Sequence, residues 1–201
     1  LPGDFNIANT ALAAVMLLGA GLEPKRIAAG LGEVTGVPGR MERVGGGLPN
    51  EPMALVDYAH TPEAVELALR ALRPAVRGHL WIVLGAGGDR DRSKRAAMGE
   101  VAARLADRVV VTDDNPRSER PQEIRRALLD GAGRVPTAER AEIHEEGDRR
   151  SAIRLAVSMA DPDDVVLVAG KGHEQGQEVE GIVHPFDDRI ELRAALEAVT
   201  R

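Results

Sequence analysis

The chain contains no cysteine and very few aromatic residues. The absence of cysteine excludes disulfide bonds, thiol catalysis and cysteine-ligated metal sites. Aromatic residues make up only 2% of the 201 residues, so we expect a core of leucine, valine, isoleucine and alanine side chains. No apolar run reaches the roughly 18 residues that a membrane-spanning helix requires, so no membrane span is expected. Hydrophobic residues at 43% and charged residues at 29% are nonetheless typical of a globular protein with a buried core.

The chain also lacks an excess of basic charge and an N-terminal signal peptide. The formal net charge is −6 and no basic stripe occurs, which argues against a protein that binds nucleic acid. The first residues, Leu-Pro-Gly-Asp-Phe-Asn, include neither an initiator methionine nor the basic and apolar regions of a signal peptide. We therefore expect a cytoplasmic protein and a segment taken from a longer chain. No Walker A motif occurs, so this segment lacks that phosphate-binding loop.

Two short helical patterns precede a change in the sequence. Residues 8–20 favour a helix that ends before Gly21, and Pro24 starts a second helix that runs to about residue 31. The stretch at 32–39 is rich in glycine and proline and interrupts the helical pattern. It predicts a domain boundary, with residues 1–37 forming a helical first part and residues 38–201 forming the main domain.

Beyond that boundary, short apolar runs alternate with amphipathic helical patterns. Strands are expected at 53–57, 80–84, 109–112, 143–145 and 165–169, and helices at 62–72, 94–105, 121–129, 149–160 and 188–199. Two of the strands, Leu-Trp-Ile-Val-Leu and Val-Val-Leu-Val-Ala, are apolar throughout, as strands covered on both faces are. The expected fold is an α/β, Rossmann-like, mostly parallel sheet with helices on both faces.

Polar residues directly follow four of the predicted strands. In α/β sheets of this kind, ligands bind beyond the carboxyl ends of the strands. We therefore expect the four clusters to meet at one edge of the sheet and to form a binding site. The clusters are Asp57, Tyr58 and His60, then Gly85 to Arg92, then Asp113 to Arg117, and finally Gly170 to Glu174.

The residue types in these clusters suit a small ligand that carries both charges. Arg90 and Arg117 offer the guanidinium fork that binds carboxylates and phosphates, and Asn115 offers a donor and an acceptor. Glu174 could accept an ammonium group. Taken alone, however, each cluster also fits a turn or a solvated run of charges.

No metal site is expected in the chain. His173 and Glu174 are adjacent and converge poorly on one ion, and no cysteine or clustered histidine supports them. Thr61 followed by Pro62 fits a helix N-cap and the first helical position, so we expect Thr61 to be structural.

Several motifs in order resemble the Mur ligase family over essentially the whole chain. Gly-Asp-Phe-Asn-Ile-Ala-Asn at 3–9 and Val-Pro-Gly-Arg-Met-Glu at 37–42 come first. Asp-Tyr-Ala-His-Thr-Pro at 57–62 and Gly-Gly-Asp-Arg-Asp at 87–91 follow. The last pair, Asp-Asn-Pro-Arg at 114–117 and Gly-Lys-Gly-His-Glu at 170–174, resembles the members that add meso-diaminopimelate.

The resemblance implies an ATP-dependent amide ligase of peptidoglycan precursor synthesis. Such a ligase joins meso-diaminopimelate to UDP-MurNAc-L-Ala-D-Glu through an acyl phosphate, with Mg²⁺ as cofactor. In the family, the P-loop and the metal ligands belong to a central domain, so we expect this chain to be an inactive fragment. It would comprise the end of that central domain and the C-terminal domain that binds the amino acid.

The resemblance also implies site residues, although it assigns no catalytic or metal-ligating residue here. The nucleotide-binding residues would be Asn6, Asn9, Arg40, Asp57 and His60. The residues that bind meso-diaminopimelate would be Arg90, Asp114, Asn115, Pro116, Arg117, Gly170 and Glu174, with Lys171 and His173 as further candidates. Among these, the two arginines and the asparagine would bind the distal carboxylate, and the Gly170 carbonyl and Glu174 would bind the distal ammonium.

The sequence leaves three alternative functions to weigh. They are a lysine-adding Mur ligase, a ligase similar to folylpolyglutamate synthase, and a non-catalytic Rossmann nucleotide-binding module. Arg117 argues against the first, and the last two motifs taken together argue against the second. A dinucleotide-binding module would need Gly-x-Gly-x-x-Gly after its first strand, where this chain has Asp57, Tyr58 and Ala59.

Overall fold

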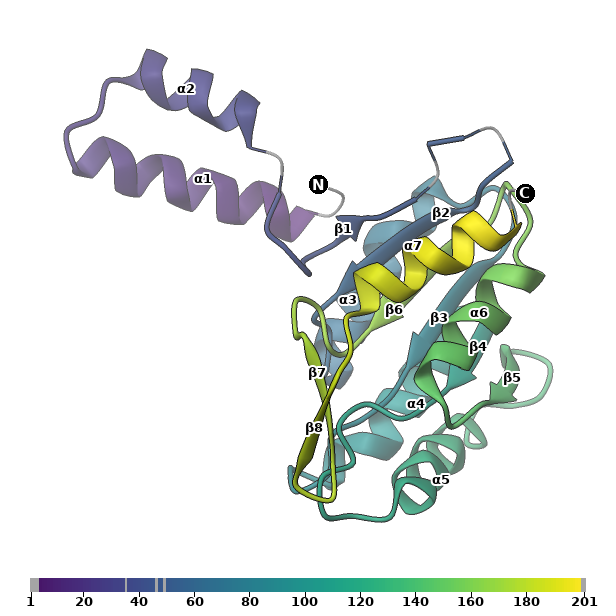
Figure 1. Cartoon of the computed structure of the whole chain (residues 1–201). Coiled ribbons are helices and arrows are strands. Elements are labelled where there is room, and N and C mark those ends of the chain that lie inside the picture. Colours follow the sequence, from purple (N-terminus) through teal and green to yellow (C-terminus); the bar gives the residue numbers. More distant parts are fainter. Residues whose placement is uncertain (1–3, 35, 46, 49, 200–201) are drawn as a thin grey trace.

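The structure, a computed structural model, describes residues 4–34, 36–45, 47–48 and 50–199. Gly3 of the first motif and the outermost residues of both predicted domains therefore lie outside the described residues. A six-stranded sheet in the order β1-β2-β6-β3-β4-β5 forms the centre of the fold (Figure 1). Its strands are β1 (Glu42–Arg43), β2 (Met53–Asp57), β3 (Leu80–Leu84), β4 (Arg108–Val111), β5 (Glu142–Glu145) and β6 (Val165–Ala169).

The strands of this sheet run parallel except for β1, which pairs antiparallel with β2. The register pairs Asp57 at the end of β2 with Ala169 at the end of β6. Ala169 in turn pairs with Leu84 of β3, and Leu84 pairs with Val111 of β4. The segments that follow these four strands therefore leave the sheet from one level at the same edge.

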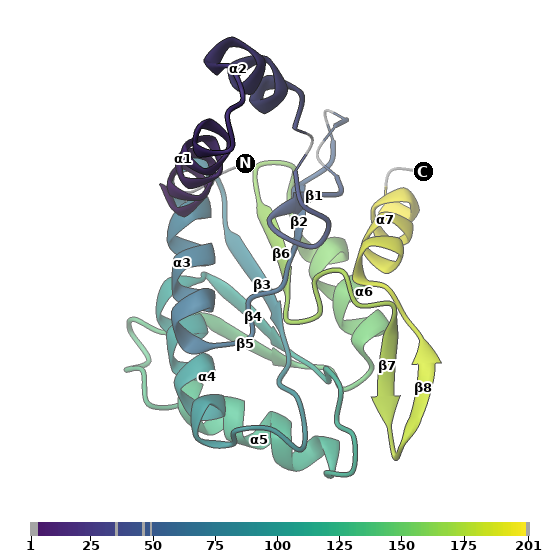
Figure 2. The ribbon, with the colours of Figure 1, turned by 90° about the vertical axis from the view of Figure 1, so that its left-hand side faces the viewer.

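Helices cover both faces of the sheet, which confirms the predicted fold class (Figure 2). One face carries α3 (Pro62–Leu72), α4 (Ser93–Leu105) and α5 (Pro121–Ala132), and the other carries α6 (Arg149–Met159) and α7 (Asp188–Val199). In β3, Leu80, Ile82 and Leu84 pack into the core under α3 and α4. Trp81 and Val83 pack into the core on the opposite face. Because side chains alternate along a strand, a strand that is apolar throughout contributes to two cores.

Side chains cap the starts of two helices, and the first of these caps was expected from the sequence. The Thr61 hydroxyl accepts a hydrogen bond from the Ala64 N–H at 3.2 Å, and Pro62 occupies the first helical position of α3. The predicted structural role of Thr61 is thus confirmed. Asp148 caps α6 in the same way and accepts from the Ser151 N–H at 2.8 Å. Both caps satisfy N–H groups that have no partner within the helix.

A pair of helices precedes the sheet and stands apart from it in Figure 1. They are α1 (Asp4–Gly19), which starts before the expected residue 8, and α2 (Pro24–Glu33). Apolar side chains of α1, including Leu12, Val15 and Met16, are mostly exposed. The described part of the chain therefore leaves an apolar surface on α1 uncovered. Within the described ranges, no helix is long and apolar enough to cross a membrane.

The sequence pattern did not predict the antiparallel hairpin formed by β7 (Gly176–Val179) and β8 (Ile182–Pro185). The turn between them consists of Glu180 and Gly181, whose φ angles are 51° and 78°. Two positive φ angles are typical of the tight turn that fits the twist of a hairpin. Gly181 was the available signal, but β7 is too polar for its sequence to predict a strand. The short elements β1 and η1 (Arg73–Ala75) were likewise not predicted.

Candidate functional site

A cavity of about 220 Å³ lies at the carboxyl ends of the parallel strands, and we call it the strand-end cavity. Its walls come from the segments that follow β2, β3, β4 and β6, which is the edge where the sequence predicted a site. The residues assigned to the amino-acid substrate line it together, apart from Pro116. The lining comprises Tyr58, His60, Ala86, Gly87, Arg90, Lys94, Asp114, Asn115, Arg117, Gly170 and Glu174.

Arg117 is held at this cavity by contacts to two other segments. Its Nη1 donates to the Gly88 carbonyl oxygen at 2.8 Å, and its Nε lies 3.2 Å from a carboxylate oxygen of Glu178 in β7. The Arg117 N–H donates to the Glu178 carbonyl at 3.0 Å, and the Glu180 N–H donates to the Arg117 carbonyl at 2.7 Å. These bonds hold Arg117 at a φ of 52°, a conformation that non-glycine residues seldom adopt. The β7–β8 hairpin therefore positions both the backbone and the guanidinium of Arg117.

Positive and negative groups share the lining of the strand-end cavity. Arg90, Lys94 and Arg117 contribute cationic side chains, and Asp114 and Glu174 contribute carboxylates. Such a lining suits a small ligand with both a carboxylate and an ammonium group, because each group meets a partner of opposite charge.

The further candidates Lys171 and His173 occupy different places. Lys171 is fully buried, and its Nζ donates to Asn115 Oδ1 at 2.8 Å. His173 is exposed, and its ring centroid lies 5.7 Å from that of Tyr58. Lys171 is therefore placed to support the cavity from within the protein, whereas His173 remains accessible to solvent.

Two glycines of the predicted motifs allow the loops beside the cavity to pack closely. A Cβ atom on Gly88 would lie 1.9 Å from the Pro116 carbonyl oxygen, and the Gly88 N–H donates to the Asn115 carbonyl at 2.8 Å. Gly170 has a φ of 117°, and a Cβ atom there would lie 2.6 Å from Asp114 Oδ2. Both glycines and Pro116 thus serve the packing that presents the polar side chains.

Glu119 joins the same loops through a buried ion pair. Its carboxylate accepts hydrogen bonds from Arg95 Nη1 at 3.0 Å and Nη2 at 2.8 Å, and also from the Asp89 N–H at 2.6 Å. Arg92 approaches the carboxylate to 3.1 Å. The hydrogen bonds from Arg95 lower the pKa of Glu119 from an ordinary 4.5 to about 2.

This ion pair predicts how folding stability depends on pH. The pKa of Glu119 is lower in the folded chain than in the unfolded chain. The contribution of its carboxylate to the free energy of unfolding is therefore complete above pH 4.5 and is lost as the pH falls toward 2. Replacing Glu119 with glutamine should lower the free energy of unfolding at pH 7 by about 2 kcal/mol, because Arg95 then stays buried beside a neutral partner. Urea unfolding at neutral and acidic pH measures this difference, which should narrow as the pH falls. A difference that stays constant with pH would contradict the assigned pKa.

A second cavity, of about 590 Å³, lies between the two N-terminal helices and the sheet domain, and we call it the α1–α3 cavity. Asn6, Asn9, Arg40 and Asp57, all assigned to the nucleotide, line it together. His60, the remaining residue of that set, lines the strand-end cavity instead. The other lining residues are mostly apolar and comprise Thr10, Ala13, Leu31, Val34, Val37, Ala64, Leu67 and Ala68.

Asp57 is fixed at the end of β2 by backbone hydrogen bonds. Its Oδ2 accepts from the Met41 N–H at 2.8 Å, and its Oδ1 accepts from the Ala59 N–H at 2.8 Å. Burial raises the pKa of Asp57, and these N–H groups and the charge of Arg40 oppose that rise. Because Met41 has a φ of 47°, the carboxylate also holds an unusual backbone conformation in place. Asp57 thus ties the segment before β1 to the end of β2.

Tyr58 connects the linings of the two cavities. The guanidinium carbon of Arg40, which lines the α1–α3 cavity, lies 4.7 Å from the centroid of the Tyr58 ring. On the other side, the rings of Tyr58 and His60 have centroids 4.6 Å apart, and both residues line the strand-end cavity. His60 Nδ1 lies 2.7 Å from the Tyr58 carbonyl oxygen, so the neutral imidazole carries its proton on Nδ1.

Three residues of the site were not assigned a role from the sequence: Tyr58, Lys94 and Glu178. Tyr58 and Lys94 line the strand-end cavity. Tyr58 belongs to the motif at 57–62 and Lys94 follows the motif at 87–91 by three residues, which was the signal available for them. Glu178 contacts Arg117 from the unpredicted hairpin, so no local pattern indicated it.

A metal centre is not formed by the described residues, which contain no group of three or more histidine, aspartate or glutamate side chains arranged to hold an ion. The residues present therefore do not fit the Mg²⁺ that the resemblance implies.

A family model and several similar proteins point to the same family. The family model described as "Mur ligase, glutamate ligase domain" matches residues 39–172. A UDP-N-acetylmuramoyl-L-alanyl-D-glutamate–2,6-diaminopimelate ligase of Streptomyces avermitilis is 56% identical over 197 residues, covering 98% of this chain and 38% of the relative. The protein of the same description from Caulobacter vibrioides is 51% identical over 199 residues, covering 99% of this chain and 39% of the relative.

A solved structure with the same protein description superimposes with a TM-score of 0.75 at 38% identity, covering 100% of this chain and 40% of that one. The chain therefore spans about two fifths of the length of these relatives.

Proposed function

The chain belongs to the Mur ligase family, and from this membership we propose that it is part of an ATP-dependent ligase that attaches meso-diaminopimelate to UDP-MurNAc-L-Ala-D-Glu. Similar proteins are described as ligases of this specificity. Residues 38–201 are then the domain that binds the amino acid, and residues 1–37 are the end of an ATP-binding domain. Because ATP is a cytoplasmic substrate, we place the reaction in the cytoplasm.

The charge arrangement of the strand-end cavity is the observation that carries this proposal. Diaminopimelate differs from lysine by one carboxylate, which is bonded to the carbon that also bears the distal amine. Arg90, Asn115 and Arg117 supply donors for that carboxylate. The Glu174 carboxylate and the Gly170 carbonyl supply acceptors for the distal ammonium. Lysine would leave N–H donors of Arg90 and Arg117 without the carboxylate acceptor that diaminopimelate supplies, which is a large penalty in a partly buried site.

We assign the α1–α3 cavity to ATP, the second substrate. Its mainly apolar lining with a few polar groups is typical of a site for a heterocyclic base. Asn6 and Asn9 offer amide groups to the adenine, and Asp57 offers the remaining lone pairs of its carboxylate to the ribose. Arg40 packs against the nucleotide, and His60 faces the phosphates at the junction with the strand-end cavity. Mg²⁺ would be held mainly by the central domain of the complete protein.

The proposed reaction proceeds in two steps. A carboxylate oxygen of the D-glutamyl residue attacks the γ-phosphorus of ATP, and ADP leaves, which yields an acyl phosphate. The amine of diaminopimelate attacks the acyl carbon, the bond from that carbon to the phosphate oxygen breaks, and inorganic phosphate and a proton are released. The residues of this chain contribute by binding. When the distal end of diaminopimelate is held in the strand-end cavity, its reacting amine is directed toward the α1–α3 cavity.

Ligation by the complete protein that contains this chain tests the proposal. With ATP, Mg²⁺ and UDP-MurNAc-L-Ala-D-Glu, meso-diaminopimelate should yield ADP, phosphate and the tripeptide product in equal amounts, measured by phosphate release and mass spectrometry. L-lysine at the same concentration should yield little product. Equal use of lysine, glutamate addition to a folate, or nucleotide binding without any ligation would each favour one of the alternative functions and overturn this one.

A further inference from the structure

Lys171 is a fully buried cation directly behind the strand-end cavity. It lies between Gly170 and Gly172, whose φ angles are 117° and 56°. A Cβ atom on Gly172 would lie 2.7 Å from the Cβ of Tyr58, so the loop also packs tightly against the segment after β2. The two glycines give the loop its conformation, in which the Lys171 side chain points into the protein.

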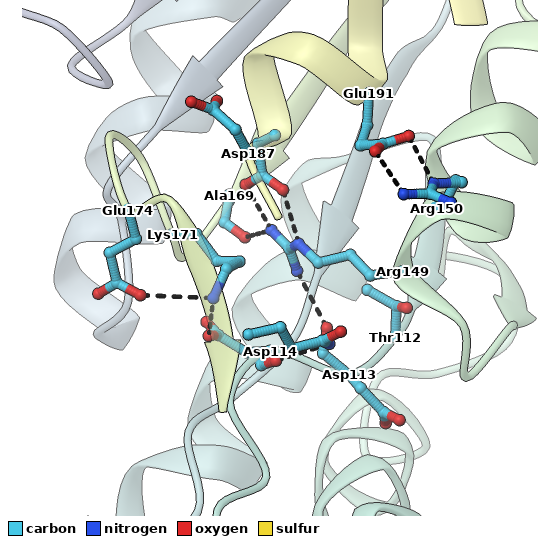
Figure 3. A network of polar contacts seen from close by, with 12 residues as sticks. Thr112, Asp113, Asp114, Arg149, Arg150, Ala169, Lys171, Glu174, Asp187 and Glu191 are labelled. Atoms are coloured by element: carbon cyan, nitrogen blue, oxygen red, sulfur yellow. Dashed lines mark hydrogen bonds and ion pairs between the residues drawn. The ribbon is translucent and has the colours of Figure 1, made fainter. Parts of the chain in front are cut away.

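The Lys171 ammonium has three partners from the site. Its Nζ donates to Asn115 Oδ1 at 2.8 Å and lies 3.4 Å from Glu174 Oε2 and 3.6 Å from Asp114 Oδ1. Figure 3 shows the side chain reaching toward Asp114 and Glu174 from the loop after β6. An ammonium has three hydrogens and no lone pair, so each of these neighbours has to present an acceptor to it.

The side-chain amide of Asn115 is therefore limited to one orientation. Its Oδ1 accepts from both Lys171 Nζ and the Glu178 N–H, the latter at 3.0 Å. Its Nδ2 donates to Glu174 Oε2 at 2.9 Å. If the amide were flipped, its NH₂ group would face an ammonium and an N–H, and its oxygen would face a carboxylate. Lys171, together with the Glu178 N–H, thus favours the orientation in which the Asn115 amide presents N–H groups on the side of Glu174.

Glu174 is oriented by the same cation. Lys171 and Asn115 both contact its Oε2. The other oxygen points away from Lys171 in Figure 3. A carboxylate held by one oxygen keeps the second oxygen available as an acceptor for a ligand ammonium.

We propose that Lys171 is a positioning residue for the amino-acid substrate: without touching the substrate, its buried ammonium sets the donor face of Asn115 and the acceptor oxygen of Glu174. The proposal rests on the proposed function, because it names the substrate that these two groups receive. It further predicts an effect on substrate binding and selectivity, with little effect on the chemical step.

Lys171→Met in the complete protein tests this role, because methionine keeps the length of the side chain and removes the charge. The KM for meso-diaminopimelate should rise about 30-fold, kcat should change less than about threefold, and the KM for ATP should stay unchanged. Lys25→Met is the matched control, since Lys25 is exposed on α2 and lines neither cavity, and its removal should alter none of these constants. A variant that only unfolds more easily, with an unchanged KM for diaminopimelate, would overturn the proposal.

A structural measurement separates this proposal from the proposed function. In this chain labelled with ¹⁵N-asparagine, the side-chain amide protons of Asn115 should exchange slowly with solvent. Lys171→Met should accelerate this exchange by about tenfold or more. Unchanged exchange would refute the positioning role even if the complete protein adds diaminopimelate. Accelerated exchange in a protein that adds no diaminopimelate would instead leave the positioning of Asn115 intact and refute the proposed function. If Lys171→Met does not fold, Lys171→Gln, which keeps an NH₂ donor group without the charge, should show the same changes to a smaller extent, and its unchanged KM would refute the proposal.

Discussion

Arg117→Ala in the complete ligase should raise the KM for meso-diaminopimelate by about 1,000-fold, equivalent to about 4 kcal/mol. Arg117 lines the strand-end cavity and is already held by the Gly88 carbonyl and the Glu178 carboxylate, so its guanidinium is ordered before the substrate arrives. Removing an ordered cation leaves the carboxylate of the substrate in the cavity with too few donors. The small rate with L-lysine, which lacks that carboxylate, should change little. Initial-rate kinetics with both amino acids therefore measure a loss of selectivity.

Arg120→Ala is the matched control for this experiment. Arg120 lies three residues further along the same segment, its side chain is 83% exposed, and its ion pair with Glu123 is a surface contact at 3.8 Å. Its removal should leave the KM for diaminopimelate unchanged. If Arg117→Ala had no more effect than Arg120→Ala, the distal carboxylate would not bind at Arg117, and the proposed substrate would lose its main support.

Arg149→Met should lower the free energy of unfolding by about 4 kcal/mol, because it leaves a buried carboxylate without its partner. Arg149 is completely buried at the start of α6, where its Nε and Nη2 donate to the two carboxylate oxygens of Asp188 at 2.7 Å and 2.8 Å. Its Nη2 also donates to the Ala169 carbonyl at 2.9 Å, so one side chain joins α6, α7 and the end of β6 (Figure 3). Urea unfolding of this chain at neutral pH measures the loss.

The neighbouring residue offers a matched control for the effect of burial. Arg150 makes the same two-point contact with Glu191 of α7, at 2.7 Å and 2.8 Å, but its side chain is 48% exposed. Arg150→Met should therefore lower the free energy of unfolding by less than about 1 kcal/mol. The double variant Arg149→Met/Asp188→Leu should recover part of the loss, because an apolar pair can replace a buried ion pair. Equal effects of Arg149→Met and Arg150→Met would show that burial of the Arg149–Asp188 pair does not determine its contribution to the free energy of unfolding.

The sequence by itself determined the sheet and the edge that carries the site. The bounds predicted for β2, β3 and β6 are those observed, because runs of about five apolar, mostly β-branched or aliphatic residues are too short for a typical helix and are characteristic of strands covered on both faces. Parallel strands end at the same edge, so the polar residues that follow them had to meet there. The grouping of Arg90, Arg117 and Glu174 in one cavity is a consequence of this pattern.

Only the tertiary structure decided which of these residues face a ligand and which support it. Lys171 and Glu174 belong to one short motif, yet Lys171 is buried and Glu174 lines the cavity. Their directions depend on Asn115, which comes from a different strand end. Likewise, the backbone of Arg117 is held by Glu178 in a hairpin that no local pattern predicted. Strand and helix patterns are local properties of the chain, whereas the direction of a loop side chain depends on partners distant in sequence, which come together only in the folded structure.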